Sequence, residues 1–181
     1  MLTVQIAETE RFDEEKNEFI YCKPTSIQIE HSLISLSKWE SKWHKPFYHP
    51  INNKSTEELL DYIRCMTLTQ NVKPEVYFQL TNANMKEIQD YIDDSMTATT
   101  FSNHGSGPPC RDIITAELIY YWMIAYNIPV EFEKWHLNRL LTLIRICAIK
   151  NSKPTKMSKK ALLSRNQALN AARKKQFNTS G

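Results

Sequence analysis

Glycine is scarce in this chain of 181 residues. It has three glycines, Gly105, Gly107 and Gly181, where average usage would give about 13. The scarcity excludes the glycine-dependent phosphate and nucleophile motifs, because no GxGxxG, GxxxxGKS/T or GxSxG string is present. It also argues against an all-β fold with many tight turns. A hydrophobic content of 41% and a charged content of 24% predict a folded domain.

A long hydrophobic run is also lacking. The longest nearly uncharged stretch, residues 113–126, contains Glu117 and stops before Pro129, so it is shorter than the about 20 residues that span a membrane. We therefore expect no contact with a membrane. The opening MLTVQIAETERFDEE carries acids where a secretory signal needs bases and an apolar run. We therefore expect the protein to stay in the cytoplasm where it is made.

Metal-binding and catalytic patterns are missing as well. The cysteines lie about 40 residues apart without a CxxC pair, which favours reduced, mostly buried thiols. His44 and His49 are separated by five positions across Pro46, which is no recognised ligand spacing. His136, between Trp135 and Leu137, is expected to be a structural histidine. No catalytic, metal or cofactor residue is therefore assigned. The four cysteines are Cys22, Cys65, Cys110 and Cys147.

Acidic residues end at Glu133. Residues 134–181 carry 12 Lys or Arg and no acid, whereas residues 1–133 carry 11 bases against 20 acids, a net charge of −9. This division predicts an acidic body, residues 1–150, and a basic C-terminal arm, residues 151–181. Three roles for the arm remain open: docking on an acidic surface of this or a neighbouring copy, binding nucleic acid, or binding a partner protein.

The first 30 residues favour β-structure. LTVQI alternates apolar and polar residues, and FIYC (19–22) and SIQIE (26–30) flank a turn around Pro24. We interpret the last two segments as a hairpin within a small antiparallel sheet.

Helical spacing begins after His31 and continues in four segments. The apolar positions 33, 36, 39 and 43 predict a helix that ends before Pro46. STEE at 55–58 is a capping-box sequence that predicts a helix start. Pro74 is expected in the first turn of a short helix to Leu80, and Asn82 or Asn84 is expected to cap a helix to Met96.

Two later segments are the most apolar. We expect Asp112 to cap a helix over 113–126 that is apolar on nearly every face and forms the centre of the core. Residues 130–149 predict a second core helix. Trp122 and Leu141 are the side chains expected to anchor these helices in the core. Residues 97–110, which hold both internal glycines and a Pro-Pro pair, predict a surface connection, with a lid as the alternative.

The arm is expected to form a helix from Ser158 onward. Its apolar seam is made of alanines and two leucines, which is too little to support an independent domain, so it needs a surface to lie on. Eight basic residues between Lys153 and Lys175 can contact phosphates, but the arm has no aromatic residue before Phe177. We therefore expect no sequence-specific nucleic-acid binding. The predicted partner-binding residues are Lys159, Lys160, Leu162, Arg165, Leu169, Arg173, Lys174 and Lys175.

Five long segments resemble a known protein family. They are IQIEHSLISLSKWESKWHKPF (27–47), STEELLDYIRCMTLT (55–69), YIDDSMTATTF (91–101), ITAELIYYWMIAYNIPVEFEKWHLNRLLTLIRIC (114–147) and KMSKKALLSRNQALNAARKKQFNTSG (156–181). They resemble the tail assembly chaperones of long-tailed bacteriophages. The resemblance implies a protein that coats the tape-measure protein and recruits tail-tube subunits, and that can also have a longer form made by translational frameshift.

The sequence thus predicts a mainly α protein: a helical bundle with a small N-terminal antiparallel β element and a basic C-terminal helical arm. The expected function is that of a non-enzymatic tail assembly chaperone in the host cytoplasm, which binds tape-measure and tail-tube proteins and either self-associates or assembles into a multi-subunit complex. The alternative is a structural protein of the tail, baseplate or head-tail joint, retained in the virion, whose arm clasps neighbouring subunits.

Overall fold

A computed structural model of the chain describes residues 1–13, 17–49, 54–101, 113–151 and 159–178. Contacts within the chain divide it into two units, Met1–Ala148 and Ile149–Gly181. The protein is mainly α, with a small antiparallel β element at the N-terminus, so the predicted fold class is confirmed. Across the described ranges, none of the helices has the length and apolar character that crossing a membrane requires.

The N-terminal strands form two antiparallel ladders. β1 (Leu2–Ile6) pairs with β4 (Thr25–Ile29), and β2 (Thr9–Asp13) pairs with β3 (Glu18–Cys22). The predicted hairpin of 19–22 with 26–30 is therefore wrong, because these two segments follow each other along one side of the ribbon.

Both ladders have the same register, so the four strands form one long hairpin that reverses between Asp13 and Glu18. The pairing of its two sides is interrupted at Ala7. Pro24 lies at this interruption, where its missing N–H breaks the ladder instead of turning the chain. The side of β1 and β4 that faces the core carries four fully or almost fully buried residues. They are Val4, Ile6, Ile27 and Ile29.

Helix α1 (Leu33–Trp43) lies at the centre of the core. Ser32 and Ser35 form a reciprocal capping box at its start, and His44, at φ 52°, ends it. The helix packs against α2 and α4. Its buried stripe consists of Leu33, Leu36, Trp39 and Glu40, with Ser35 beside it.

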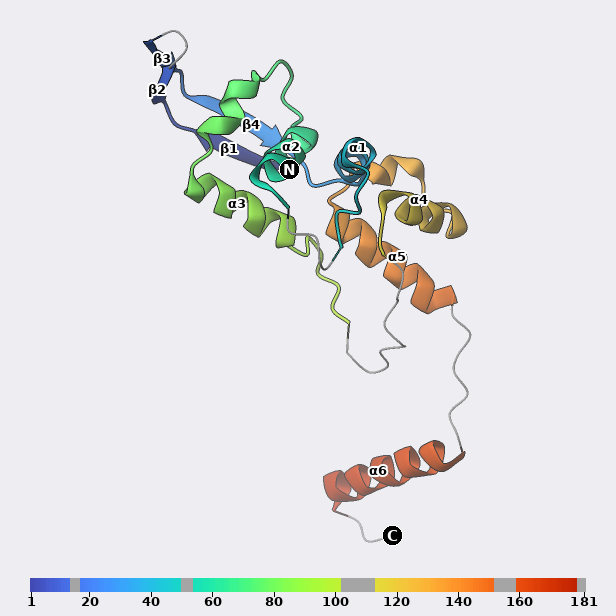
Figure 1. Cartoon of the computed structure of the whole chain (residues 1–181). Coiled ribbons are helices and arrows are strands. Elements are labelled where there is room, and N and C mark those ends of the chain that lie inside the picture. Colours follow the sequence, from blue (N-terminus) through green and yellow to red (C-terminus); the bar gives the residue numbers. More distant parts are fainter. Residues whose placement is uncertain (14–16, 50–53, 102–112, 152–158, 179–181) are drawn as a thin grey trace. The chain divides into compact units, whose positions relative to one another are not determined.

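The next segments confirm most of the predicted helices. α2 (Thr56–Met66) starts at the predicted Ser55–Glu58 capping box. η1 (Pro74–Gln79) is a short 3₁₀ helix. α3 (Asn82–Asp93) is capped by Thr81 rather than by either predicted asparagine, although Asn84 completes the capping box. Figure 1 shows α3 alongside β1, where the Asn84 side chain donates a hydrogen bond to the Gln5 carbonyl at 3.0 Å.

Helix α4 (Ala116–Ala125) differs from the prediction. Thr115, not Asp112, is its N-cap residue, and Asp112 lies outside the described residues. Only one stripe of α4 is buried, formed by Ala116, Ile119 and Met123. Trp122 is only partly buried. The expected role of α4 as the central core helix is therefore wrong, because α4 packs on the core through one face and leaves the other in solvent.

Two further elements follow α4, and the second of them runs three residues past Ala148, where the first unit ends. η2 (Val130–Lys134) is a 3₁₀ turn, and α5 (Leu137–Asn151) buries Leu137, Leu140 and Ile144. Leu141, one of the two predicted anchors, is partly buried beside this stripe. The start of α5 is tied to the start of α1, because the Leu137 amide donates to the His31 carbonyl at 2.7 Å.

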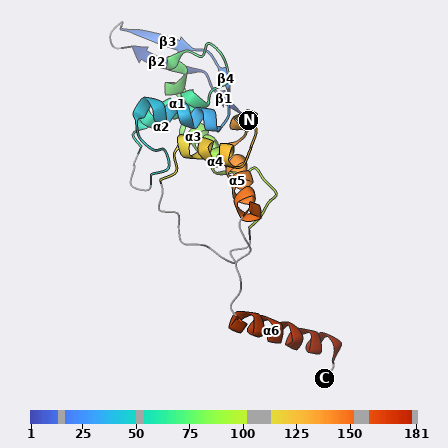
Figure 2. The same ribbon diagram turned by 90° about the vertical axis from the view of Figure 1, so that its right-hand side faces the viewer.

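The second unit contains helix α6 (Lys159–Phe177), which Figure 2 shows as one uninterrupted helix. Every described side chain of α6 is exposed. Of the predicted connection 97–110, the structure describes residues 97–101, which lie in no helix or strand; the rest falls outside the described residues.

Candidate functional site

The predicted partner-binding residues all lie on α6. Helical geometry puts Leu162 and Leu169 on one face, two turns or about 10 Å apart, with Arg173 one further turn along. Arg165 lies on the flank of the same face. Lys160, Lys174 and Lys175 lie on the opposite side of the helix. The structure therefore brings together an apolar seam and two arginines, and distributes the remaining charge around the helix.

The leucines of α6 are unusually open to solvent. Leu162 is 47% exposed and Leu169 is 45% exposed, and Leu163 and Phe177 are more exposed still. No acidic residue occurs on α6, and Lys174 and Lys175 lie in the last turn, where the helix dipole favours positive charge. The arrangement can bind an acidic surface that also offers apolar contacts.

A buried glutamate ties three segments of the body together. Glu40 Oε1 accepts a hydrogen bond from the Phe47 amide and Oε2 accepts one from the Ala116 amide, both at 2.7 Å. Burial raises the pKa of this carboxyl, and the two backbone hydrogen bonds oppose the shift. The side chain is thus used to hold the start of α4 against α1. Sequence reasoning missed it, although an acid on the Leu33, Leu36 stripe was a signal.

His31 is fully buried between two tyrosines. Its Nδ1 lies 2.7 Å from the Tyr62 hydroxyl and its Nε2 lies 3.3 Å from the Tyr48 hydroxyl. Burial, with a smaller effect from His136, lowers the pKa of His31 to about 3. The imidazole is therefore neutral at pH 7 and serves to join α2 to the 44–49 loop. The sequence offered no local sign of this role.

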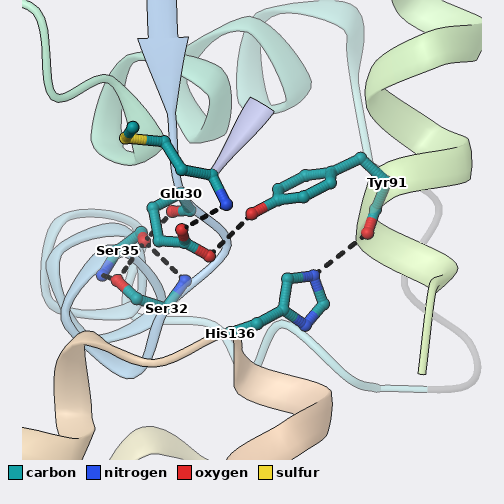
Figure 3. A network of polar contacts seen from close by, with 6 residues as sticks. Glu30, Ser32, Ser35, Tyr91 and His136 are labelled. Atoms are coloured by element: carbon teal, nitrogen blue, oxygen red, sulfur yellow. Dashed lines mark hydrogen bonds and ion pairs between the residues drawn. The ribbon is translucent and has the colours of Figure 1, made fainter. Parts of the chain in front are cut away.

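His136 belongs to a second polar cluster, shown in Figure 3. Its Nε2 donates to the Tyr91 carbonyl at 3.0 Å, because a carbonyl can only accept. The Tyr91 hydroxyl donates to Glu30 Oε1 at 2.7 Å, and the Met1 amine lies 2.8 Å from Glu30 Oε2. His136 is buried, as expected of a structural histidine, but its Nδ1 has no hydrogen-bond partner among the described residues.

Two further buried carboxylates, both on α2, pair with lysines in or just after α1. Asp61 accepts from Lys42 at 2.5 Å and from the Trp43 indole at 2.9 Å. Glu58 accepts from Lys45 at 2.6 Å and completes the α2 capping box. The Lys45 ammonium and the Ser55 amide lower the pKa of Glu58. These carboxylates have structural partners, so none is positioned as a free acid or base.

The candidate metal ligands do not come together. Within the described ranges, the structure contains no group of three or more His, Cys, Asp or Glu side chains that could hold a metal ion. His44 is the exposed residue that ends α1, and His49 is half-buried in the following loop. Cys65 and Cys147 are free thiols. His104 and Cys110 lie outside the described residues.

The best candidate site is accordingly the exposed surface of α6, whose chemistry suits binding to a macromolecule. Comparison with models of protein families, with characterised proteins and with solved structures gave no match.

Proposed function

We propose that this protein is a non-enzymatic assembly factor of a phage tail, a tail assembly chaperone that binds the tape-measure protein through α6 and promotes tail-tube assembly. The phage assignment is supported by the resemblance of the five sequence segments. The mode of action is supported by the chemistry of α6.

The exposure of α6 carries the proposal. A helix with exposed leucines and no acidic residue lacks the burial that normally stabilises a helix in a protein, so it gains most when it lies on a partner. Its bases would steer the approach to an acidic partner, and Leu162 and Leu169 would anchor the complex. The proposal requires that the tape-measure protein present acidic and apolar side chains along its length.

The buried polar groups of the body support a non-enzymatic role. Glu40, Glu58 and Asp61 each accept hydrogen bonds that fasten one segment to another, and His31 is fully buried between tyrosines. In the part of the chain that the structure describes, these groups do not converge on an open pocket with a nucleophile. They stabilise the fold that carries the binding surfaces.

A structural protein of the virion is the second candidate, and exposed apolar side chains on the body favour it. Phe19 and Tyr21 are exposed on β3, and Tyr121 and Ile124 are exposed on α4. A subunit that remains in an assembly contacts several neighbours, and exposed apolar patches mark surfaces for such contacts.

Binding of the full chain to purified tape-measure fragments tests the proposal. We expect tight binding that keeps most of its affinity between 50 and 200 mM salt, because leucine contacts do not depend on counterion release. The double variant Leu162→Asp, Leu169→Asp should lose binding, whereas Leu68→Asp, an exposed site on the body, should retain it. Tight binding to duplex DNA that ignores the leucine changes and falls about a thousandfold over this salt range would contradict the proposal.

Mass spectrometry of purified virions separates the two candidates. A chaperone leaves the particle, so we expect the protein to be absent or present only in traces. Several copies per particle would instead establish the structural role.

A further inference from the structure

Helix α4 presents an apolar face to solvent. Tyr121 is 63% exposed and Ile124 is 75% exposed, and Val130, just beyond the helix, is 62% exposed. Tyr121 and Ile124 are three positions apart and share one face, opposite the buried stripe of Ala116, Ile119 and Met123. Large apolar side chains grouped in this way mark an interaction surface rather than ordinary scattered exposure.

The charge of this face is negative. Glu117 is exposed, and Tyr121 and Ile124 follow it by four and seven positions. The three side chains therefore lie on the same side of α4. Glu131 is also exposed, next to Val130. Residues 112–133 contain four acids and no Lys or Arg. A partner for this face therefore needs apolar side chains with positive charge beside them.

Helix α6 has the complementary chemistry. It exposes Leu162, Leu169 and Phe177, and it carries six bases and no acid between Lys159 and Phe177. Arg173 lies one turn beyond Leu169 on the leucine side. Two α4 faces would bring two acidic surfaces together, and two α6 helices would bring two basic surfaces together. The unlike pair is the combination that satisfies both the apolar contact and the charge.

We propose that α6 of one copy docks on the exposed α4 face of a second copy. The contact joins two different surfaces, so it is heterologous and links copies head to tail or closes a ring or dimer. It is a self-assembly contact that uses the same side of α6 as the tape-measure interaction proposed above, so one α6 helix makes one of the two contacts at a time.

Sedimentation of the full chain over a range of concentrations tests the first half of this proposal. We expect a mass that rises above that of the monomer with concentration. Ile124→Asp should weaken the association about tenfold or more, because it places a charge in the centre of the apolar contact. Phe78→Asp is the matched control, since Phe78 is 58% exposed on η1, away from α4, and this variant should associate like the wild type.

Charge exchange tests which surfaces meet. The pair Glu117→Lys, Glu131→Lys should weaken association, and so should the pair Arg165→Glu, Arg173→Glu, whose residues lie on the leucine side of α6. The chain with all four changes should regain it, since attraction is restored with the signs reversed. These residues are exposed, so circular dichroism should show unchanged folding in each variant.

Three results would overturn the contact. They are a full chain that stays monomeric at every concentration, an oligomer that Ile124→Asp leaves unchanged, and a variant with all four charge changes that associates as weakly as the two double variants. Ile124→Asp leaves α6 intact, so tape-measure binding measured with this variant separates a failure of the self-assembly contact from a failure of the proposed function.

Discussion

Trp39 is the largest fully buried side chain in the body. It packs against Phe47 and Tyr62, and its indole donates to the Glu58 carbonyl at 2.9 Å. We expect Trp39→Ala to lower the free energy of unfolding by about 3 to 5 kcal/mol, through lost packing and an unpaired carbonyl. Trp122→Ala, at a partly buried position, should cost clearly less. Urea denaturation of both variants checks this ranking, and equal costs would contradict it.

His31 makes the stability depend on pH. Its pKa is about 3 in the folded protein, below its ordinary 6.5, so between these values the unfolded chain binds a proton that the folded chain does not. The contribution of His31 to the free energy of unfolding is complete above pH 6.5 and is lost as the pH falls toward 3. The loss from this group approaches about 1.4 kcal/mol per pH unit in that window.

Urea denaturation between pH 4.5 and 7.5 measures this effect. His31→Gln removes the titrating group while keeping a side chain that can hydrogen-bond, so its stability should fall less steeply with acid than that of the wild type. His136, whose pKa burial also lowers, remains in both proteins, so its own titration contributes to both curves. Parallel curves for the two proteins would show that His31 does not carry the dependence.

Residues whose partners are distant in sequence could not be predicted. His31 meets Tyr62, 31 positions away, and Glu40 meets the Ala116 amide, 76 positions away. Their partners depend on the packing of α1 against α2 and α4, which no local pattern records, although the place of Glu40 on the apolar stripe of α1 indicated that its side chain is buried. The residues of α6 were predictable as a group because their charge imbalance is visible in the sequence itself.

At the scale of elements, the α2 capping box is a clear target. The Ser55 hydroxyl accepts from the Glu58 amide at 3.2 Å, and Glu58 accepts from the Ser55 amide at 2.9 Å. Ser55→Ala should lower stability by about 1 kcal/mol and Tm by about 2 to 4 °C. Thermal denaturation measures the shift, with Ser95→Ala, an exposed site outside the helices, as the control. An unchanged Tm would mean that Glu58 alone holds the helix start.

Local signals predicted element starts better than element partners. The Ser55 capping box needs only neighbours three positions apart, and it was predicted correctly. Pro24 marks an irregularity, but a break in a long hairpin and a turn between two strands contain the same residues. The all-round apolar sequence of α4 concealed which stripe is buried, because its exposed face carries Tyr121 and Ile124 instead of polar side chains.

For the whole molecule, the division into two units predicts that the arm is dispensable for folding. A chain that stops after Asn151 should keep cooperative unfolding and a Tm within a few degrees of the full chain, since among the described residues the buried hydrophobic side chains all lie between Val4 and Ile144. Circular dichroism during heating checks the result. A broad transition, or a fall of more than about 10 °C, would show that α6 supports the body, since a shift of that size corresponds to several kcal/mol.

The two ends of the long N-terminal hairpin differ in how many neighbouring strands hydrogen-bond to them. β4 lies between β1 and the chain at residues 66–68. There the Glu30 amide donates to the Met66 carbonyl at 2.9 Å, and the Leu68 amide donates to the Gln28 carbonyl at 2.8 Å. In the described residues, β2 and β3 form a ladder only with each other. In deuterated water the amide protons of β2 and β3 should therefore exchange early, and those of β4 should persist almost as long as the folded state itself.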